Sequence, residues 1–198
     1  MIDQINYFLE KEKYTLDNLK DAYLYACKKD IELVKPGNVN LNSPHSDTTA
    51  QDYLNSATLS SKELFREEYS LGERILKSIN VTRETVSTNT NLGIILLCAP
   101  IVQACTNFNN LGLKEGLKKV LKNTSIQDTQ DLCMAIKISS PGGLGRSNIY
   151  DINSKPITTI EEIMGYSANY DRISYQYAHN YGDIFDFIIP RLVFLNEK

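Results

Sequence analysis

A nearly uninterrupted apolar run at positions 92–104 constrains the fold of this chain more than any other segment. It reads Leu-Gly-Ile-Ile-Leu-Leu-Cys-Ala-Pro-Ile-Val-Gln-Ala and has no polar face. A helix that is apolar on every side must be surrounded by other apolar elements. The run is also shorter than the roughly 20 apolar residues that a bilayer-spanning helix needs. We therefore expect a central buried helix, no membrane span, and a kink or break at Pro100, which lacks a backbone N–H.

Helix start signals recur along the rest of the chain. Thr15 precedes an apolar stripe at helical spacing, as a helix N-cap does, and that helix must end before Pro36. Four further hydroxyl residues are each followed three positions later by an acid or amide, which is the pattern of a capping box. These pairs are Ser60 with Glu63, Ser70 with Glu73, Thr124 with Gln127, and Thr158 with Glu161.

The end of the chain and its few strand signals complete the fold prediction. Residues 173–188 have the apolar spacing of one long amphipathic closing helix, which Pro190 should stop. The short alternation at residues 38–42 is bounded by Gly37 and Pro44 and indicates an ordered loop rather than a strand. The sequence thus predicts an all-α, single-domain bundle of several helices around the central apolar helix, spanning residues 1–198.

Charge and cysteine usage exclude several classes of partner and site. The formal net charge is −3 and no basic block is present, which argues against nucleic acid and anionic lipid as partners. The first residues show no secretory signal, so we expect a cytoplasmic protein. The four cysteines have no C-x-x-C spacing and are predicted to be reduced thiols that mainly fill the core, a metal or catalytic role being the minor alternative: Cys27, Cys98, Cys105 and Cys133.

A polar irregular segment at residues 35–47 is the first candidate for chemistry. Its Lys-Pro-Gly start forms an elbow that pushes Lys35 out of helical geometry, where a lysine can meet a phosphate. For an isolated elbow, a helix stop with a solvated lysine would be the better explanation of the residues. The concentration of other polar side chains favours a site, and these are Glu32, Asn38, Asn40, His45 and Asp47. His45 and Asp47 are suited to proton transfer or to a carboxylate-rich magnesium site.

Two further segments interrupt the helical pattern. Residues 88–93, Thr-Asn-Thr-Asn-Leu-Gly, precede the apolar helix, where free backbone N–H groups and the helix dipole favour an anion. Asn and Thr are also ordinary capping residues there. Residues 141–146, Pro-Gly-Gly-Leu-Gly-Arg, form a glycine-rich loop whose Arg146 could close over phosphates, although a flexible connection explains it about as well.

In this order, the motifs resemble the triphosphoribosyl-dephospho-CoA synthase family. Its members carry a Lys-Pro-Gly elbow, a His-x-Asp shortly after it, and an Asn-Thr-x-x-Gly motif ahead of an apolar helix. The similarity runs from about residue 30 to residue 186. A shorter branch, found beside other cofactor-biosynthesis proteins, is more similar still, through Lys-Pro-Gly-Asn-Val-Asn, Asn-Thr-Asn-Leu-Gly-Ile-Ile-Leu-Leu, Pro-Gly-Gly-Leu-Gly and the late Asp-Arg-Ile at 171–173.

The resemblance implies an all-helical enzyme that uses ATP and Mg²⁺. In this reaction a ribose hydroxyl of dephospho-CoA attacks the anomeric carbon of ATP and adenine leaves. The resemblance also implies a role for each matching position. In the elbow segment, Lys35 binds phosphate, while Gly37, Asn38 and Asn40 shape the pocket. His45 and Asp47 serve proton transfer or bind magnesium, and Glu32 is a second metal candidate. Asn89, Thr90 and Gly93 form the wall at the helix start, and Asp171 contacts metal or ribose.

One departure from the family pattern leaves alternatives open. The synthases have His-Lys in their Asn-Thr-His-Lys-Gly motif, where this chain has Asn91 and Leu92. The glycine usual before the His-x-Asp is absent as well. Either Arg146 replaces the missing cation or the substrate differs. The alternatives are a nucleotide-binding enzyme of pterin-type cofactor biosynthesis with a different transfer or hydrolysis, and a non-catalytic helical binding module. The expected partners are ATP and a small-molecule cofactor precursor, and the oligomeric state, a homodimer included, stays open.

Overall fold

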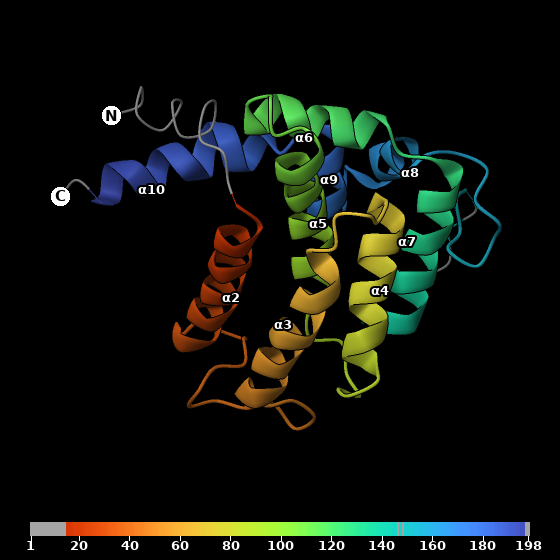
Figure 1. Ribbon diagram of the computed structural model, residues 1–198. Coiled ribbons are helices and arrows are strands. Elements are labelled where there is room, and N and C mark those ends of the chain that lie inside the picture. Colours follow the sequence, from red (N-terminus) through yellow and green to blue (C-terminus); the bar gives the residue numbers. More distant parts are fainter. Residues whose placement is uncertain (1–14, 146, 148, 197–198) are drawn as a thin grey trace.

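The computed structural model describes residues 15–145, 147 and 149–196, and these residues form an all-α structure (Figure 1). This confirms the predicted fold class. No strand forms among them, and the segment predicted as an ordered loop contains a single isolated bridge between Asn40 and Ser43. The helices in chain order are α2 (Leu16–Glu32), α3 (Ala50–Leu64), α4 (Leu71–Arg83), α5 (Leu92–Asn107), α6 (Leu113–Lys122), α7 (Ile126–Ser139), α8 (Ile160–Ser167), α9 (Arg172–Ala178), the π-helix η1 (Asp183–Ile188) and α10 (Ile189–Asn196).

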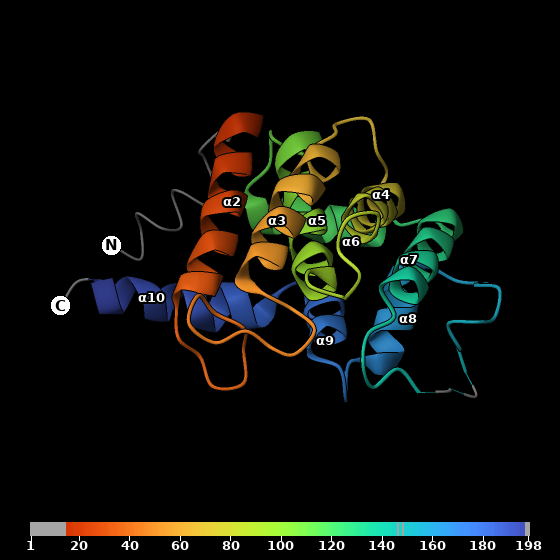
Figure 2. The ribbon, with the colours of Figure 1, turned by 90° about the horizontal axis from the view of Figure 1, so that it is seen from below.

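The apolar run forms α5, which lies in the middle of the bundle with α3 and α4 on one side and α6 and α9 around it (Figures 1 and 2). Ile95 and Ala99 on α5 have no exposed surface. Truncating a buried isoleucine to alanine costs about 2–5 kcal/mol, so this helix contributes strongly to stability. In the described part of the chain, no helix has the length and apolar character needed to cross a membrane.

α5 continues through Pro100 without a break. Proline has no N–H, so the carbonyl of Leu96, four residues earlier, loses its intrahelical donor. The buried Tyr177 hydroxyl from α9 donates to that carbonyl oxygen at 2.6 Å. Tyr181, also buried, donates to the carbonyl of Leu97 at 2.9 Å. Tyr177 thus satisfies the carbonyl that the proline leaves without its helical donor, and Tyr181 adds a second hydrogen bond one residue later.

Two of the predicted helix starts are confirmed. Thr15 Oγ1 accepts a hydrogen bond from the backbone N–H of Asn18 at 3.2 Å and caps α2. Ser70 and Glu73 form a reciprocal capping box at the start of α4. In each case a short polar side chain satisfies a backbone donor that the first helical turn leaves free.

Three predicted capping boxes are wrong. Ser60 lies inside α3 and donates to the carbonyl of Ser56, because the helix already begins after Thr49, which forms the box with Asp52. The box of α7 is Ser125 with Asp128, one residue later than Thr124 with Gln127. α8 starts after Thr159 with no side-chain cap, and the Thr158 hydroxyl instead contacts Glu162. The acceptor-x-x-acid pattern is short, and tertiary packing decides which copy starts a helix.

The single closing helix predicted for residues 173–188 is also wrong. α9 ends at Ala178, and Asn180 and Tyr181 adopt positive φ angles of 50° and 59°, which a continuous helix does not allow. The chain then forms η1 and α10. Pro190 is the second residue of α10 rather than a stop, because proline is tolerated near the start of a helix.

α4 and α7 pack closely through Gly72 and Asp128. The Asp128 carboxylate accepts from the backbone N–H of Gly72 and from that of Ser125, both at 2.8 Å. A Cβ atom on Gly72 would lie 2.4 Å from the Cα of Asp128, so only glycine fits. Burial alone would raise the pKa of Asp128, but the hydrogen bonds from Ser70, Gly72 and Ser125 together hold it below its usual value.

The four cysteines are free thiols, as predicted. Burial raises the pKa of Cys27 to about 11 and that of Cys105 to about 11. Because the thiolate is the reactive form, these thiols are inert near neutral pH.

Candidate active site

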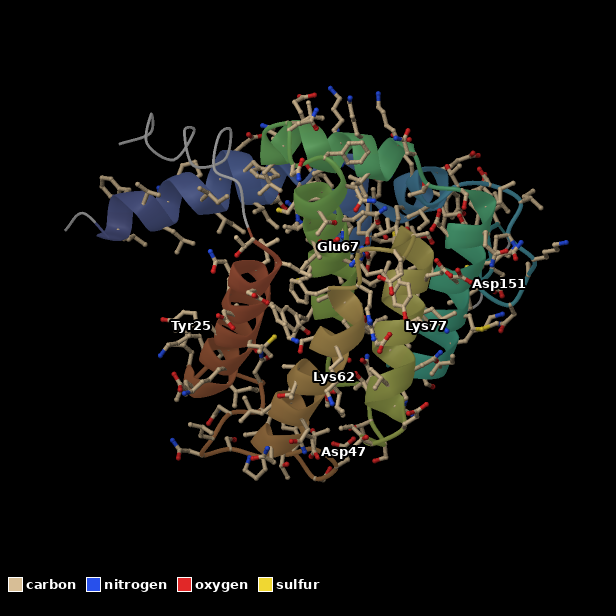
Figure 3. The ribbon with its side chains drawn as sticks, viewed as in Figure 1. Tyr25, Asp47, Lys62, Glu67, Lys77 and Asp151 are labelled. Atoms are coloured by element: carbon tan, nitrogen blue, oxygen red, sulfur yellow. The ribbon has the colours of Figure 1, made fainter. Side chains whose placement is uncertain are left out.

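A polar pocket of about 460 Å³ lies at one end of the bundle. Figure 3 shows Asp47 at this end, below α3 and near the end of α4. All three segments singled out in the sequence contribute to it. Its lining residues, called here the polar pocket, are His45, Asp47, Thr48, Tyr53, Arg83, Ser87, Thr88, Asn89, Ser139, Ser140 and Gly142.

The ends of four helices bring these residues together. α3 and α5 begin at the pocket, and the N-terminus of a helix carries a positive partial charge. α4 and α7 end there, at Arg83 and Ser139. Ser140 turns the chain away from α7 with a φ of 48°. At the start of α5, Asn89 Oδ1 accepts from the backbone N–H of Leu92 at 3.1 Å. The pocket thus lies between helix termini and outside the apolar core.

Arg83 provides a cation that the sequence-based site did not include. It is in the last turn of α4, and its Nη1 donates to the carbonyl of Val86 at 3.3 Å. It forms no ion pair with any described carboxylate, so the guanidinium keeps free donors. Thr88 Oγ1 is buried and, among the described residues, has no hydrogen-bond partner. The only sequence signal for Arg83 was its position five residues before the 88–93 segment.

His45 and Asp47 lie on the loop that precedes α3. The backbone N–H of His45 donates to the carbonyl of Thr48 at 2.9 Å, which closes a tight turn. The Thr48 hydroxyl donates to Asp47 Oδ1 at 3.4 Å. Both the imidazole and the carboxylate are exposed, so a ligand in the polar pocket can reach them.

The elbow residues predicted to bind phosphate do not line the polar pocket. Lys35 pairs with Asp30. Gly37 adopts a φ of 78°, which explains the glycine, and the backbone N–H of Asn38 donates to the carbonyl of Lys35 at 3.2 Å. Asn40 is buried, and its Oδ1 accepts from the backbone N–H of Asn42 at 3.0 Å. The elbow therefore shapes the loop that carries His45 and Asp47.

Thr90 and Asn91 are buried and do not line the polar pocket. The hydroxyls of Thr90 and Ser56 lie 2.6 Å apart. Asn91 Nδ2 donates to Thr82 Oγ1 at 3.1 Å and to the carbonyl of Ser56 at 3.4 Å. These contacts tie α3, α4 and the start of α5 together behind the polar pocket. Both residues are buried and position the wall that Thr88 and Asn89 present.

A second pocket, of about 440 Å³ and mostly apolar, contains two other predicted residues, Gly93 and Asp171. Asp171 is the N-cap of α9, and its Oδ1 accepts from the backbone N–H of Ser174 at 2.6 Å. Asn89 and Gly142 line this apolar pocket as well as the polar one. Arg146 lies outside the described residues.

The comparison with known families decides the class of the protein. A family model described as ATP:dephospho-CoA triphosphoribosyl transferase matches residues 16–196. The chain belongs to this family. The match confirms the resemblance predicted from the motifs, and it establishes a transferase whose family acts on ATP and dephospho-CoA. Searches of curated proteins and of solved structures gave no match.

Magnesium has no ready-made protein cage in the described part of this transferase, where no group of three or more His, Cys, Asp or Glu side chains could hold a metal ion. Glu32, one of the two predicted metal ligands, is instead 2.6 Å from Lys29 Nζ and 3.7 Å from Lys28 Nζ, and does not line the polar pocket. Asp47 does line it. Mg²⁺ usually binds through one or two carboxylates together with substrate phosphates. A site formed by Asp47 and a nucleotide would fit that pattern.

Proposed function

We propose that this transferase moves the triphosphoribosyl group of ATP to dephospho-CoA in the polar pocket and releases adenine. The observation that carries the proposal is the convergence of three distant segments, 45–48, 87–89 and 139–142, on one polar space that also contains Arg83. Family membership supports the substrates. The pocket volume is within the 300–1,000 Å³ typical of small-molecule sites.

The reaction requires a small set of groups. The acceptor hydroxyl oxygen forms a bond to the ribose anomeric carbon, and the bond from that carbon to the adenine nitrogen breaks. The bonding electrons leave with adenine, which takes up a proton, while the hydroxyl proton passes to a base. The site must therefore hold a polyanion, accept a proton, and favour the positive charge that develops on the ribose.

The wall formed by Arg83, Thr88 and Asn89 is suited to the phosphates. Arg83 offers a planar set of N–H donors that matches phosphate oxygens. Thr88 contributes a hydroxyl that has no protein partner among the described residues, so a phosphate that reaches it adds a hydrogen bond without breaking one. The N-terminus of α5 adds a positive partial charge beside Asn89. In this proposal Arg83 supplies the positive charge that the synthases have as a lysine at the position of Leu92.

The loop before α3 is suited to proton transfer and to magnesium binding. Asp47 and His45 are exposed on one short turn within the polar pocket. Asp47 would take the hydroxyl proton or be a ligand of Mg²⁺. When bound, the ion would neutralise phosphate charge. His45 would orient the acceptor or relay the proton.

A direct test uses ATP, Mg²⁺ and dephospho-CoA, with mass analysis of the products. Free adenine and a dephospho-CoA product heavier by one triphosphoribosyl group are expected. Asp47→Asn should lower kcat by about 10²–10⁴-fold, the usual range for a general base. Glu67→Gln is the matched control, because Glu67 is an exposed carboxylate far from Asp47 (Figure 3). Phosphate release without adenine, or full activity of Asp47→Asn, would contradict the proposal.

Arg83→Gln tests the phosphate wall separately. Losing a hydrogen bond to a charged group costs about 1.5–3 kcal/mol, which corresponds to a roughly 10- to 150-fold weaker Kd for ATP. Arg66→Gln is the control, because Arg66 is an exposed arginine outside both pockets. Equal ATP affinity of the two variants would remove Arg83 from the site.

A further inference from the structure

The polar and apolar pockets adjoin one another, because Asn89 and Gly142 line both. The two spaces differ sharply in chemistry. The polar pocket presents a cation, a carboxylate, an imidazole and several hydroxyls. The apolar pocket has walls from four helices: Leu92 and Leu96 of α5, Leu132 and Ile136 of α7, Ile163 and Met164 of α8, and Ile173 of α9. A molecule that reaches across the junction must be charged at one end and largely apolar at the other.

Few polar groups of the apolar pocket are free to bind a charge. The Ser167 hydroxyl donates to Ser174 Oγ at 2.8 Å, and the Ser174 hydroxyl contacts Met164 Sδ at 3.2 Å. No described lysine or arginine lines this pocket. Its described walls therefore suit a flat, uncharged group and do not suit phosphates.

We propose that the apolar pocket binds the purine base of ATP. This assignment rests on the proposed function, in which the triphosphate occupies the polar pocket. In ATP the charged and flat parts are joined by a single sugar, which matches two pockets that meet at Asn89 and Gly142. The ribose and its anomeric carbon then lie at that junction. The bond that breaks lies between the two chemistries, and adenine leaves as a neutral base in an apolar space.

Asp171 selects the base in this arrangement. One carboxylate oxygen caps α9 through the Ser174 N–H, and a carboxylate has further acceptor capacity. That capacity is available for the exocyclic amino group of adenine. Hypoxanthine has an oxygen at the same position, which a carboxylate repels. Asp171 therefore sets a preference for ATP over inosine triphosphate.

The pocket assignment is tested with Leu144→Asp. Leu144 is half exposed on the loop over the apolar pocket, so a charge there disturbs the pocket with little effect on folding. Calorimetry should show a Kd for ATP raised about tenfold or more and an unchanged Kd for inorganic tripolyphosphate. Leu192→Asp on α10, equally exposed and outside the pocket, should change neither. Ile163→Asp on α8, with circular dichroism as a folding check, should repeat the effect from another wall of the apolar pocket.

The outcomes separate this inference from the proposed function. If Leu144→Asp weakens the binding of dephospho-CoA but not of ATP, or weakens the binding of neither, the base does not bind in the apolar pocket. If Arg83→Gln leaves tripolyphosphate binding unchanged, the polar pocket does not hold the triphosphate and the proposed function fails with it. The supporting result is that both variants weaken the binding of ATP, while Arg83→Gln alone weakens the binding of tripolyphosphate.

Base selection has its own measurement. In Asp171→Asn the single amide oxygen can still cap α9, because Asn is as good an N-cap as Asp. The variant then presents an N–H₂ donor toward the base. The ratio of the Kd for inosine triphosphate to the Kd for ATP should fall at least tenfold, while tripolyphosphate binding stays constant. An unchanged ratio would overturn the role of Asp171.

Discussion

Replacing Tyr177 with phenylalanine should destabilise the fold because it removes one hydrogen bond from the middle of the central helix. The Tyr177 hydroxyl donates to the carbonyl of Leu96 at 2.6 Å, and Pro100 deprives that carbonyl of its helical N–H partner. The Tyr181 hydroxyl is 3.4 Å from the same oxygen and bonds mainly to the carbonyl of Leu97. Tyr177→Phe therefore leaves the buried Leu96 carbonyl with only the distant Tyr181 hydroxyl, which already donates to Leu97.

The size of the effect follows from the desolvation of that carbonyl. An unsatisfied buried polar group costs about 1–3 kcal/mol, and Tyr177 is 2% exposed, so water cannot replace the hydroxyl. For a chain of this size, about 2 kcal/mol lowers Tm by roughly 4–8 °C. Tyr181→Phe should cost less, about 1 kcal/mol, because Ile101 retains the backbone N–H four residues after Leu97.

Urea unfolding followed by circular dichroism measures these values, and a double-mutant cycle tests their cause. Pro100→Ala returns an N–H to the position that faces the Leu96 carbonyl. In that background Tyr177→Phe should cost at least about 1 kcal/mol less than in the natural chain. An equal cost in both backgrounds would show that Tyr177 stabilises the protein by packing alone and does not replace the N–H that Pro100 lacks.

Three further predictions concern α4, α7 and the polar pocket. Gly72→Ala should destabilise the fold by about 3 kcal/mol in urea unfolding, because the new Cβ meets the Asp128 backbone at 2.4 Å. The lowered pKa of Asp128 means that its stabilisation is present above about pH 4 and is lost as the pH falls below that value; Asp128→Asn should flatten the acid limb of the stability profile. Thr88→Val should leave Tm nearly unchanged, because the hydroxyl has no partner among the described residues, yet raise the Kd for ATP by roughly 10-fold or more, since the lost hydrogen bond is to a charged phosphate.

Each of these predictions has a result that contradicts it. A Gly72→Ala variant as stable as the natural chain would mean that α4 and α7 separate easily. An acid limb that is the same with and without the Asp128 carboxylate would assign acid unfolding to other groups. A large loss of Tm in Thr88→Val would show that its hydroxyl bonds within the protein.

The fold was predictable where the sequence carries a long, redundant signal. The apolar run of α5 specifies one structure. Short capping signals were right in some places and wrong in others, and Ser70 with Glu73 is a pair that does start a helix. Ser60 has the same pattern as Ser70 but lies within α3, because Thr49 begins that helix earlier. The break after α9 depends on the positive φ of Asn180 and Tyr181, which apolar spacing does not report.

The polar pocket was predictable only in part. His45, Asp47 and Asn89 were found because irregular polar segments stand out against helices. Arg83 was missed because it lies inside a regular helix and reaches the pocket only through packing. Thr90 follows Asn89 directly, but its side chain is buried and its hydroxyl contacts that of Ser56. Neighbouring positions in the sequence therefore do not show which residue lines the pocket and which lies behind it.

Because the polar pocket is made from the ends of separate helices, substrate supply and the lifetime of the folded chain are linked. A nucleotide that binds only the native state adds about 2.7 kcal/mol of stability when its concentration is a hundred times its Kd. For a chain of this length, that raises Tm by roughly 5–11 °C. Loss of a nucleotide bound in this pocket would therefore lower the stability of the folded chain together with its activity.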